Sequence, residues 1–169
     1  MLEEMSGPVV LIVMGVSGSG KSLVGSMLAK SLGWNFREGD EFHPAANIAK
    51  MSAGLPLDDA DRAPFLAAIR AEIEACLARR EGTVFACSAL KESYRRTLVV
   101  DPARVRIVHL SGDPALIQDR LAKRQGHFMK AGMLPSQLAA LEPPLDALTL
   151  DVALAPQAMV AGIRAAFSL

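Results

Sequence analysis

The chain has 169 residues, of which 51% are hydrophobic and 21% are charged, and its 18 basic residues balance its 18 acidic residues. This length is that of one domain, so we expect a single domain over residues 1–169, and the composition excludes a disordered or collagen-like chain. Zero net charge argues against a nucleic-acid partner but leaves an anionic small molecule open, because a few N–H groups and basic side chains can bind phosphate locally.

Short runs of β-forming residues alternate along the chain with segments of helical periodicity. The expected strands are Val9–Met14, Asn35–Glu38, Thr83–Ala86, Val105–Leu110 and Leu148–Leu154. The expected helices run from the glycine-rich turn after the first strand to Gly33, from about Pro44 to Met51, from the acids at 58–61 to Arg80, over Glu92–Val99, from Asp113 to Arg124, and over Gln157–Phe167. Strands separated by helices predict an α/β fold with a parallel sheet that is covered on both faces.

The strongest chemical signal is an octapeptide that matches the phosphate-binding pattern G-x-x-x-x-G-K-[ST] between the first strand and the first helix. Its residues are Gly15, Val16, Ser17, Gly18, Ser19, Gly20, Lys21 and Ser22. Glycines let backbone N–H groups approach phosphate oxygens, and the following helix directs its positive end to the same place. Lys21 can reach the β- and γ-phosphates, and the Ser22 hydroxyl is a hard oxygen ligand for Mg²⁺. The motif therefore predicts a site for a nucleoside triphosphate with Mg²⁺.

A carboxylate is expected beside this loop. Asp40 follows Gly39 at the end of the second predicted strand, on the edge of the sheet where doubly wound folds bind ligands. It could accept the proton of an attacking hydroxyl or help to hold Mg²⁺ through water. The alternative is that Asp40 or Glu41 caps the next helix, and position alone does not decide between these roles.

Two arginines precede a stretch that is bounded by glycines. Arg120 and Arg124 lie four residues apart on one predicted helical face, directly before residues 125–132. This arrangement predicts a lid at about 124–138 that brings basic groups over the triphosphate and excludes water. The alternative is a solvated basic face followed by an ordinary loop, and taken alone His127 is more typical of a structural residue than of a base.

The N-terminus and the cysteines bear on location. The first eight residues carry two acids and no base, unlike a secretory or mitochondrial leader, and no apolar run approaches the ~20 residues that cross a bilayer. Cys76 and Cys87 cannot build a disulfide framework, and Cys87 lies in an apolar run where a buried thiol is ordinary. We therefore expect a cytoplasmic protein without a membrane partner.

Several segments downstream of the glycine-rich loop are more specific than the loop itself. With the loop, they are Gly15–Ser22, Glu38–Pro44, Asn47, Lys50–Met51, Gly54–Arg62, Cys87–Lys91, Tyr94–Arg95, Arg124–Met129, Ser136–Gln137 and Leu141–Pro144. Through them, nearly the whole chain resembles the gluconokinases, small P-loop kinases that phosphorylate D-gluconate to 6-phosphogluconate with ATP.

The resemblance implies a five-stranded parallel sheet like that of shikimate and adenylate kinases, an acceptor region at about 40–80, and a mobile lid. It implies catalytic roles for Lys21, Asp40 and Arg124, contacts of Arg120 and Arg124 with ATP, and Mg²⁺ near Ser22 and Asp40. The substrate-binding residues that it implies are Asp40, His43, Lys50, Arg62, Ser88, Lys91 and His127. Such a mixture suits a substrate with one carboxylate and five hydroxyls. A homodimer is what the family suggests.

The chain departs from the family pattern at Leu23, Phe65, Lys130 and Pro135, none of which removes a group that the chemistry needs. No acid ends the third predicted strand, so Mg²⁺ is expected to depend on Ser22, phosphates, waters and Asp40. Two alternatives stay open. One is a kinase of another acceptor, such as shikimate or a nucleoside monophosphate. The other is a regulatory module that binds nucleotide without catalysis.

Overall fold

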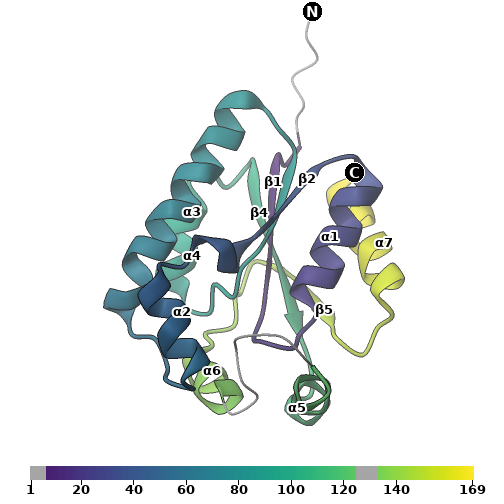
Figure 1. Ribbon diagram of the computed structural model, residues 1–169. Coiled ribbons are helices and arrows are strands. Elements are labelled where there is room, and N and C mark those ends of the chain that lie inside the picture. Colours follow the sequence, from purple (N-terminus) through teal and green to yellow (C-terminus); the bar gives the residue numbers. More distant parts are fainter. Residues whose placement is uncertain (1–6, 125–132) are drawn as a thin grey trace, which may run out of the picture.

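The computed structural model describes residues 7–124 and 133–169. Five parallel strands form one sheet in the order β2-β3-β1-β4-β5 (Figure 1). The strands are β1 Val10–Met14, β2 Asn35–Glu38, β3 Thr83–Ala86, β4 Val105–Ser111 and β5 Leu148–Asp151. The α/β fold that the alternation of strands and helices predicts, with a parallel sheet flanked by helices, is confirmed.

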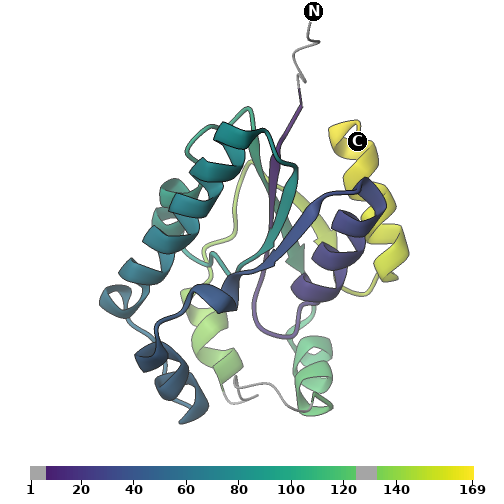
Figure 2. The same ribbon diagram turned by 45° about the horizontal axis from the view of Figure 1, so that its top comes forward.

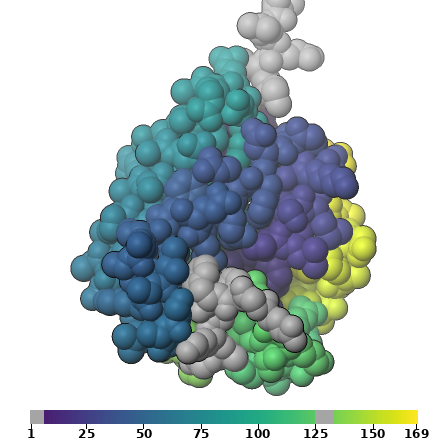
Figure 3. Space-filling view, viewed as in Figure 1, coloured from purple at the N-terminus to yellow at the C-terminus, as the bar shows by residue number. Residues whose placement is uncertain are grey.

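Helices cover both faces of this sheet. The covering helices are α1 Lys21–Leu32 and α7 Pro156–Phe167 on one face and α3 Asp59–Arg79 and α4 Glu92–Leu98 on the other (Figures 1 and 2). At the end of the sheet where the strands finish lie η1 Gly39–Phe42, α2 Ala45–Ser52, α5 Pro114–Ala122 and α6 Leu134–Ala140. In the space-filling view, α2 (blue) borders this end on the left and α5 (green) borders it on the right (Figure 3).

The hydrophobic core has two halves that share β1. Side chains on β1 alternate, so that Leu11 and Val13 pack with α1 and α7 while Val10, Ile12 and Met14 pack with α3 and α4. All five are fully buried, as expected for a central strand of a parallel sheet. Each such side chain contributes roughly 1.5–3 kcal/mol by burial, so the strand that leads into the glycine-rich loop is firmly held.

Helix α3 begins where the sequence predicts it. Asp58 and Asp61 form a capping box, in which each carboxylate accepts a hydrogen bond from the backbone N–H of the other residue. Phe65, Leu66 and Ile69 begin the buried stripe that faces the sheet. The cap fixes the first turn of α3, and the site described below uses side chains of that turn.

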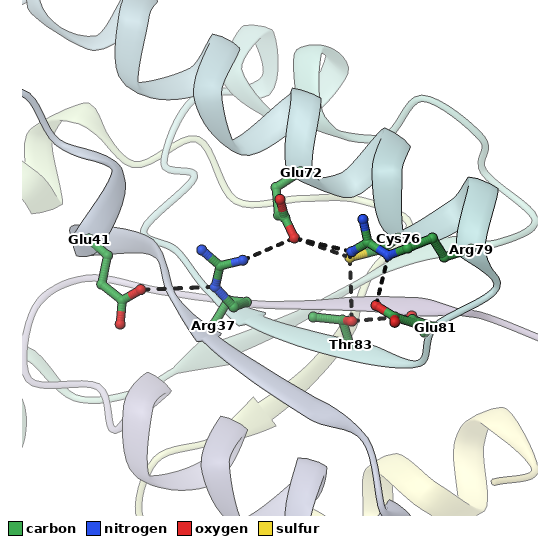
Figure 4. A network of polar contacts seen from close by, with 7 residues as sticks. All are labelled: Arg37, Glu41, Glu72, Cys76, Arg79, Glu81 and Thr83. Carbon is green, nitrogen blue, oxygen red and sulfur yellow. Dashed lines mark hydrogen bonds and ion pairs between the residues drawn. The ribbon is translucent and has the colours of Figure 1, made fainter.

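A polar network joins the edge strand β2 to α3 (Figure 4). Arg37 Nη1 lies 3.0 Å from Glu72 Oε1 and Arg37 Nε lies 3.9 Å from Glu41 Oε2, while Arg79 Nη2 lies 3.4 Å from the same Glu72 oxygen. Half-exposed ion pairs of this kind contribute about 0–1 kcal/mol each. Together they hold β2, and therefore the acidic residues at its end, against the long helix.

The structure differs from the sequence prediction at several places. The last strand ends at Asp151 instead of Leu154, because the chain turns there with a hydrogen bond of 3.0 Å from Leu154 N–H to the Asp151 carbonyl. Arg124 lies beyond the end of α5, so it does not share a helical face with Arg120. Helix α6 was not predicted, although Pro135 near its start is compatible with a first helical turn.

Over residues 7–124 and 133–169, no helix is long and apolar enough to cross a membrane. Cys76 and Cys87 are free and buried, as expected for structural thiols. Burial raises the pKa of Cys87 to about 12, so this thiol is not a nucleophile at neutral pH.

Candidate functional site: a phosphate-binding loop beside an acceptor cavity

The glycine-rich loop between β1 and α1 is compact, and its glycines are needed for its shape. Gly15 has φ +155°, and a Cβ there would lie 2.6 Å from Ser19 Oγ and 2.8 Å from the Leu110 carbonyl oxygen. Gly18 has φ +84°, and its Cβ would lie 2.7 Å from Leu121 Cγ on α5. Any side chain at either position would therefore open the loop.

The N-terminus of α1 offers its N–H groups to a ligand. Gly20 caps the helix without a side-chain hydrogen bond, and the first turn contains no acid. The first N–H groups of a helix have no partner inside it, so they can bind an anion. They border a cavity of about 280 Å³ that is lined by Gly18, Gly20, Lys21, Ser22, Leu23, Arg120, Lys123 and Arg124. The expected nucleotide residues Arg120 and Arg124 thus lie at this cavity, and the donors and cations suit a polyphosphate.

Lys21 lies with two carboxylates near it. Its Nζ donates a hydrogen bond of 3.1 Å to the Val16 carbonyl. Desolvation lowers the pKa of Lys21, whereas the negative charges of Asp40 and Glu38 act in the opposite direction. The hydrogen bond to Val16 and the two negative charges hold the ammonium in the loop. A bound phosphate could compensate there for the water that the buried ammonium has lost.

Glu38, the last residue of β2, contacts the glycine-rich loop, which was not predicted from the sequence. The Ser22 hydroxyl donates a hydrogen bond to Glu38 Oε2. Burial raises the pKa of Glu38 above its ordinary value, and the hydrogen bond from Ser22 acts against this rise. Like Asp40 two residues later, Glu38 lies at the carboxyl end of a parallel strand, where doubly wound folds bind ligands.

A second cavity of about 280 Å³ lies between the first turn of α3, the segment after β3, and α6. It is lined by Asp40, His43, Met51, Pro56, Leu57, Asp58, Asp59, Arg62, Phe65, Leu66, Ser88, Ala89, Leu90, Lys91, Tyr94, Met133, Ser136, Gln137 and Ala140. We call it the acceptor cavity. Five of the expected substrate-binding residues meet there. Lys50 does not line it, and its Nζ lies 2.8 Å from Asp61 Oδ2, while His127 is outside the described residues.

His43 is fixed beside Asp40. Its ring stacks on Phe65 with a centroid distance of 3.8 Å, and Asn47 Nδ2 lies 3.2 Å from its Nδ1. Because Asn47 donates to Nδ1, the proton of the neutral ring resides on Nε2, which lies 3.9 Å from Asp40 Oδ1. Burial lowers the pKa of His43, so the neutral ring persists at neutral pH. A neutral N–H therefore faces the Asp40 carboxylate.

Two basic side chains, Arg62 and Lys91, also line the acceptor cavity. Arg62 Nη1 donates to the Leu57 carbonyl at 2.7 Å and to the Tyr94 hydroxyl oxygen at 3.3 Å. Lys91 Nζ lies 3.0 Å from Asp59 Oδ1, which also accepts a hydrogen bond from the Tyr94 hydroxyl. The Tyr94 hydrogen bond lowers the pKa of Asp59. Asp59 was not predicted as a site residue, because an acid at the start of a helix is explained by the helix dipole. Tyr94 lies in a segment that resembles the family, but no role was predicted for it.

The segment after β3 is held in an unusual conformation. Ala89 has φ +45°, a left-handed conformation that non-glycine residues rarely adopt. The buried guanidinium of Arg95 donates to the carbonyls of Ala89 at 2.8 Å, Leu90 at 2.9 Å and Glu142 at 2.7 Å. The Gly15 N–H donates to the Ser88 carbonyl at 3.4 Å, which ties this segment to the glycine-rich loop. Arg95, which its position on α4 alone would assign to a solvated face, is thus a buried support of the site.

The chain is similar to known kinases. Residues 10–144 match a family model described as "AAA domain". A gluconokinase of Gluconobacter oxydans is 51% identical over 139 residues, which cover 82% of this chain and 78% of the relative. A crystal structure of a gluconokinase from Sinorhizobium meliloti has a TM-score of 0.83 at 43% identity and covers 95% of this chain and 94% of its own. An unliganded sugar kinase from Janibacter has a TM-score of 0.87 at 39% identity, with 94% and 93% covered.

Proposed function

This chain belongs to the gluconokinase family, and we propose that it transfers the γ-phosphoryl group of ATP to the 6-hydroxyl of D-gluconate. The observation that carries the proposal is the pair of adjoining sites. Lys21 lines the cavity at the phosphate-binding loop, and Asp40 lines the acceptor cavity. The two groups are close enough that the negative charge of Asp40 acts to raise the pKa of Lys21. An alcohol held in the acceptor cavity therefore meets a carboxylate close to the cation that would hold the transferred phosphoryl group.

In this proposal Asp40 orients the attacking hydroxyl and accepts its proton. The Nε2–H of His43 lies 3.9 Å from Asp40 Oδ1, beside the carboxylate that would accept the proton. The stacking of His43 on Phe65 keeps this N–H in place. Most of the rate enhancement would then come from positioning and from charge stabilisation, as is usual for phosphoryl transfer.

The phosphate side of the site would hold ATP through the N–H groups of α1 and through Lys21, Arg120 and Arg124. Mg²⁺ would be bound near Ser22 and Asp40, and Glu38 would join them because it accepts the hydrogen bond of the Ser22 hydroxyl. When bound, the ion neutralises charge on the triphosphate. These oxygen donors suit a hard cation.

The carboxylate of gluconate would be recognised by Arg62 and Lys91, which line the acceptor cavity. Lys91 is engaged by Asp59, which has a 70% exposed side chain and can give up its place to a substrate carboxylate. Ser88 and His43 would contact hydroxyls of the chain. A planar guanidinium can bind a carboxylate through two parallel hydrogen bonds, so we assign the main contact to Arg62.

We further propose that the protein works as a single cytoplasmic domain with its acceptor region at about 40–80. The proposed lid at about 124–138 includes residues 125–132, among them His127, which lie outside the described part of the chain. Its remaining residues include the start of α6, which lines the acceptor cavity. A homodimer and the exclusion of nucleic acid as a partner also stand as proposals.

An ADP-release assay with Mg·ATP and a panel of acceptors tests the proposed function. The panel contains D-gluconate, related sugar acids, shikimate and nucleoside monophosphates. ADP formation that depends on gluconate, with a product phosphorylated on the 6-oxygen, is the expected result. Turnover of a different acceptor, or tight ATP binding without turnover of any acceptor, contradicts the proposal.

A further inference from the structure

Gln137 contacts the phosphate-binding loop from a distant part of the sequence. Its Oε1 accepts a hydrogen bond of 2.7 Å from the backbone N–H of Ser17, 120 residues away in sequence. Gln137 is 6% exposed and Ser17 is 4% exposed. A buried N–H group without an acceptor costs free energy, because it has lost its hydrogen bonds to water. The Ser17 peptide is therefore most stable in the orientation that keeps its hydrogen bond to Gln137.

Helix α6 holds Gln137 firmly in this place. Leu134, one turn earlier on α6, is 2% exposed and packs in the same core cluster as Val16, the residue before Ser17. On its other side the loop meets α5, where Gly18 lies against Leu121. Figures 1 and 2 show α5 and α6 on opposite sides of the end of the sheet where this loop lies. The loop is therefore braced from two directions, and α6 supplies a directional polar contact.

The same helix borders the acceptor cavity. Met133 and Ser136 line that cavity together with Gln137. Directly after α6, the Glu142 N–H donates to the Leu90 carbonyl at 2.9 Å, and the Glu142 carbonyl accepts from Arg95 at 2.7 Å. A short run of chain thus contacts the nucleotide loop at one end and the acceptor segment at the other.

We propose that Gln137 is a positioning residue of this kinase. It holds the Ser17 peptide in the orientation that the following phosphate-binding N–H groups require. It also makes this orientation depend on where α6 lies beside the acceptor cavity. The proposal rests on the proposed phosphotransfer, because it assigns the loop to ATP.

The test compares Gln137→Met with Leu138→Ala. Methionine keeps the length of the side chain but lacks the acceptor, whereas Leu138→Ala weakens the packing of α6 and leaves the Ser17 hydrogen bond in place. Without the bond, the loop adopts binding-competent conformations for less of the time, so the Kd of a non-hydrolysable Mg·ATP analogue should rise about tenfold in Gln137→Met. It should change less than about twofold in Leu138→Ala.

Two further measurements accompany the calorimetric measurement of Kd. In the nucleotide-free protein, exchange of the Ser17 amide hydrogen should be faster in Gln137→Met than in the wild type, and kcat/KM for ATP should fall in parallel with affinity. Equal analogue affinities in Gln137→Met and Leu138→Ala would overturn the proposal, since a merely structural role affects both variants alike. Binding and exchange do not involve gluconate. A wild type that ignores gluconate would therefore refute the proposed function and leave this test intact.

A second variant serves if Gln137→Met does not fold. In Gln137→Glu, a carboxyl oxygen still accepts the Ser17 N–H in either protonation state. Exchange of the Ser17 amide hydrogen in the nucleotide-free protein should therefore be as slow as in Leu138→Ala, which also keeps this hydrogen bond. Faster Ser17 exchange in Gln137→Glu than in Leu138→Ala contradicts the proposal.

Discussion

Replacing Asp40 by asparagine separates the proposed proton transfer from nucleotide binding. The change keeps the shape of the side chain and removes the carboxylate that faces His43 Nε2 at 3.9 Å. Asp40 lines the acceptor cavity and not the phosphate cavity, so the N–H groups of α1, Lys21 and the two arginines that would hold ATP stay in place. Only the contact proposed between Asp40 and Mg²⁺ is weakened. A positioned general base contributes 10²–10⁴-fold, so turnover should fall by about 10² or more, which corresponds to at least roughly 2.7 kcal/mol in the activation free energy.

The assay measures steady-state ADP release at saturating gluconate, with the affinity for a non-hydrolysable ATP analogue measured by calorimetry. We expect a large fall in kcat and an analogue Kd within about threefold of the wild type. Asp113→Asn is the matched control. Asp113 caps α5 through the Ala115 N–H, and asparagine caps a helix equally well. Unchanged kcat in Asp40→Asn would remove Asp40 from the mechanism, and a comparable loss of kcat in Asp113→Asn would show that the effect is not specific.

The other predictions concern Glu38, Arg95 and Arg62. Burial raises the pKa of Glu38, so the folded protein favours the protonated form of this side chain. The resulting stabilisation is fully present below the ordinary pKa of glutamate and is lost as the pH rises through the raised pKa of the folded protein. Glu38→Gln should therefore raise Tm at about pH 7. Because the variant lacks a carboxylate near Ser22, it should also need a higher Mg²⁺ concentration for half-maximal rate. An unchanged Mg²⁺ requirement refutes the role of Glu38 near the metal. Arg95→Met leaves carbonyls around Ala89 without donors, which should lower the free energy of unfolding by roughly 2–3 kcal/mol in urea melts, whereas a change near zero contradicts the supporting role. Arg62→Met should raise KM for gluconate about tenfold and leave KM for ATP nearly unchanged, and an equal rise in both constants argues against a carboxylate contact.

The sequence was sufficient to predict those elements for which the short-range pattern and the local chemistry agree. The strand predicted at Val9–Met14, the glycine-rich loop after it and the capped start of α3 each follow from neighbouring residues. The structure has all three, with the strand beginning at Val10. The parallel sheet follows from the alternation of these elements. The candidate site at the carboxyl ends of β1 and β2 follows from the same topology.

Features that depend on contacts between distant residues could not be predicted. The Ser22–Glu38 and Ser17–Gln137 hydrogen bonds join residues that no local pattern connects. Arg95 has the same sequence signature as a solvated helical arginine, and only the fold brings three carbonyls to it. Helix α6 is short, and helices of this length owe their stability to tertiary packing more than to their own sequence.

The decisive experiment is a crystal structure of the protein with a non-hydrolysable ATP analogue, Mg²⁺ and D-gluconate. The proposed phosphotransfer predicts that the β- and γ-phosphates contact the N–H groups of Gly18–Ser22 and Lys21 Nζ, with the gluconate 6-oxygen within hydrogen-bond distance of Asp40. A triphosphate bound away from this loop, or a sugar acid whose 6-oxygen is remote from Asp40, would contradict it.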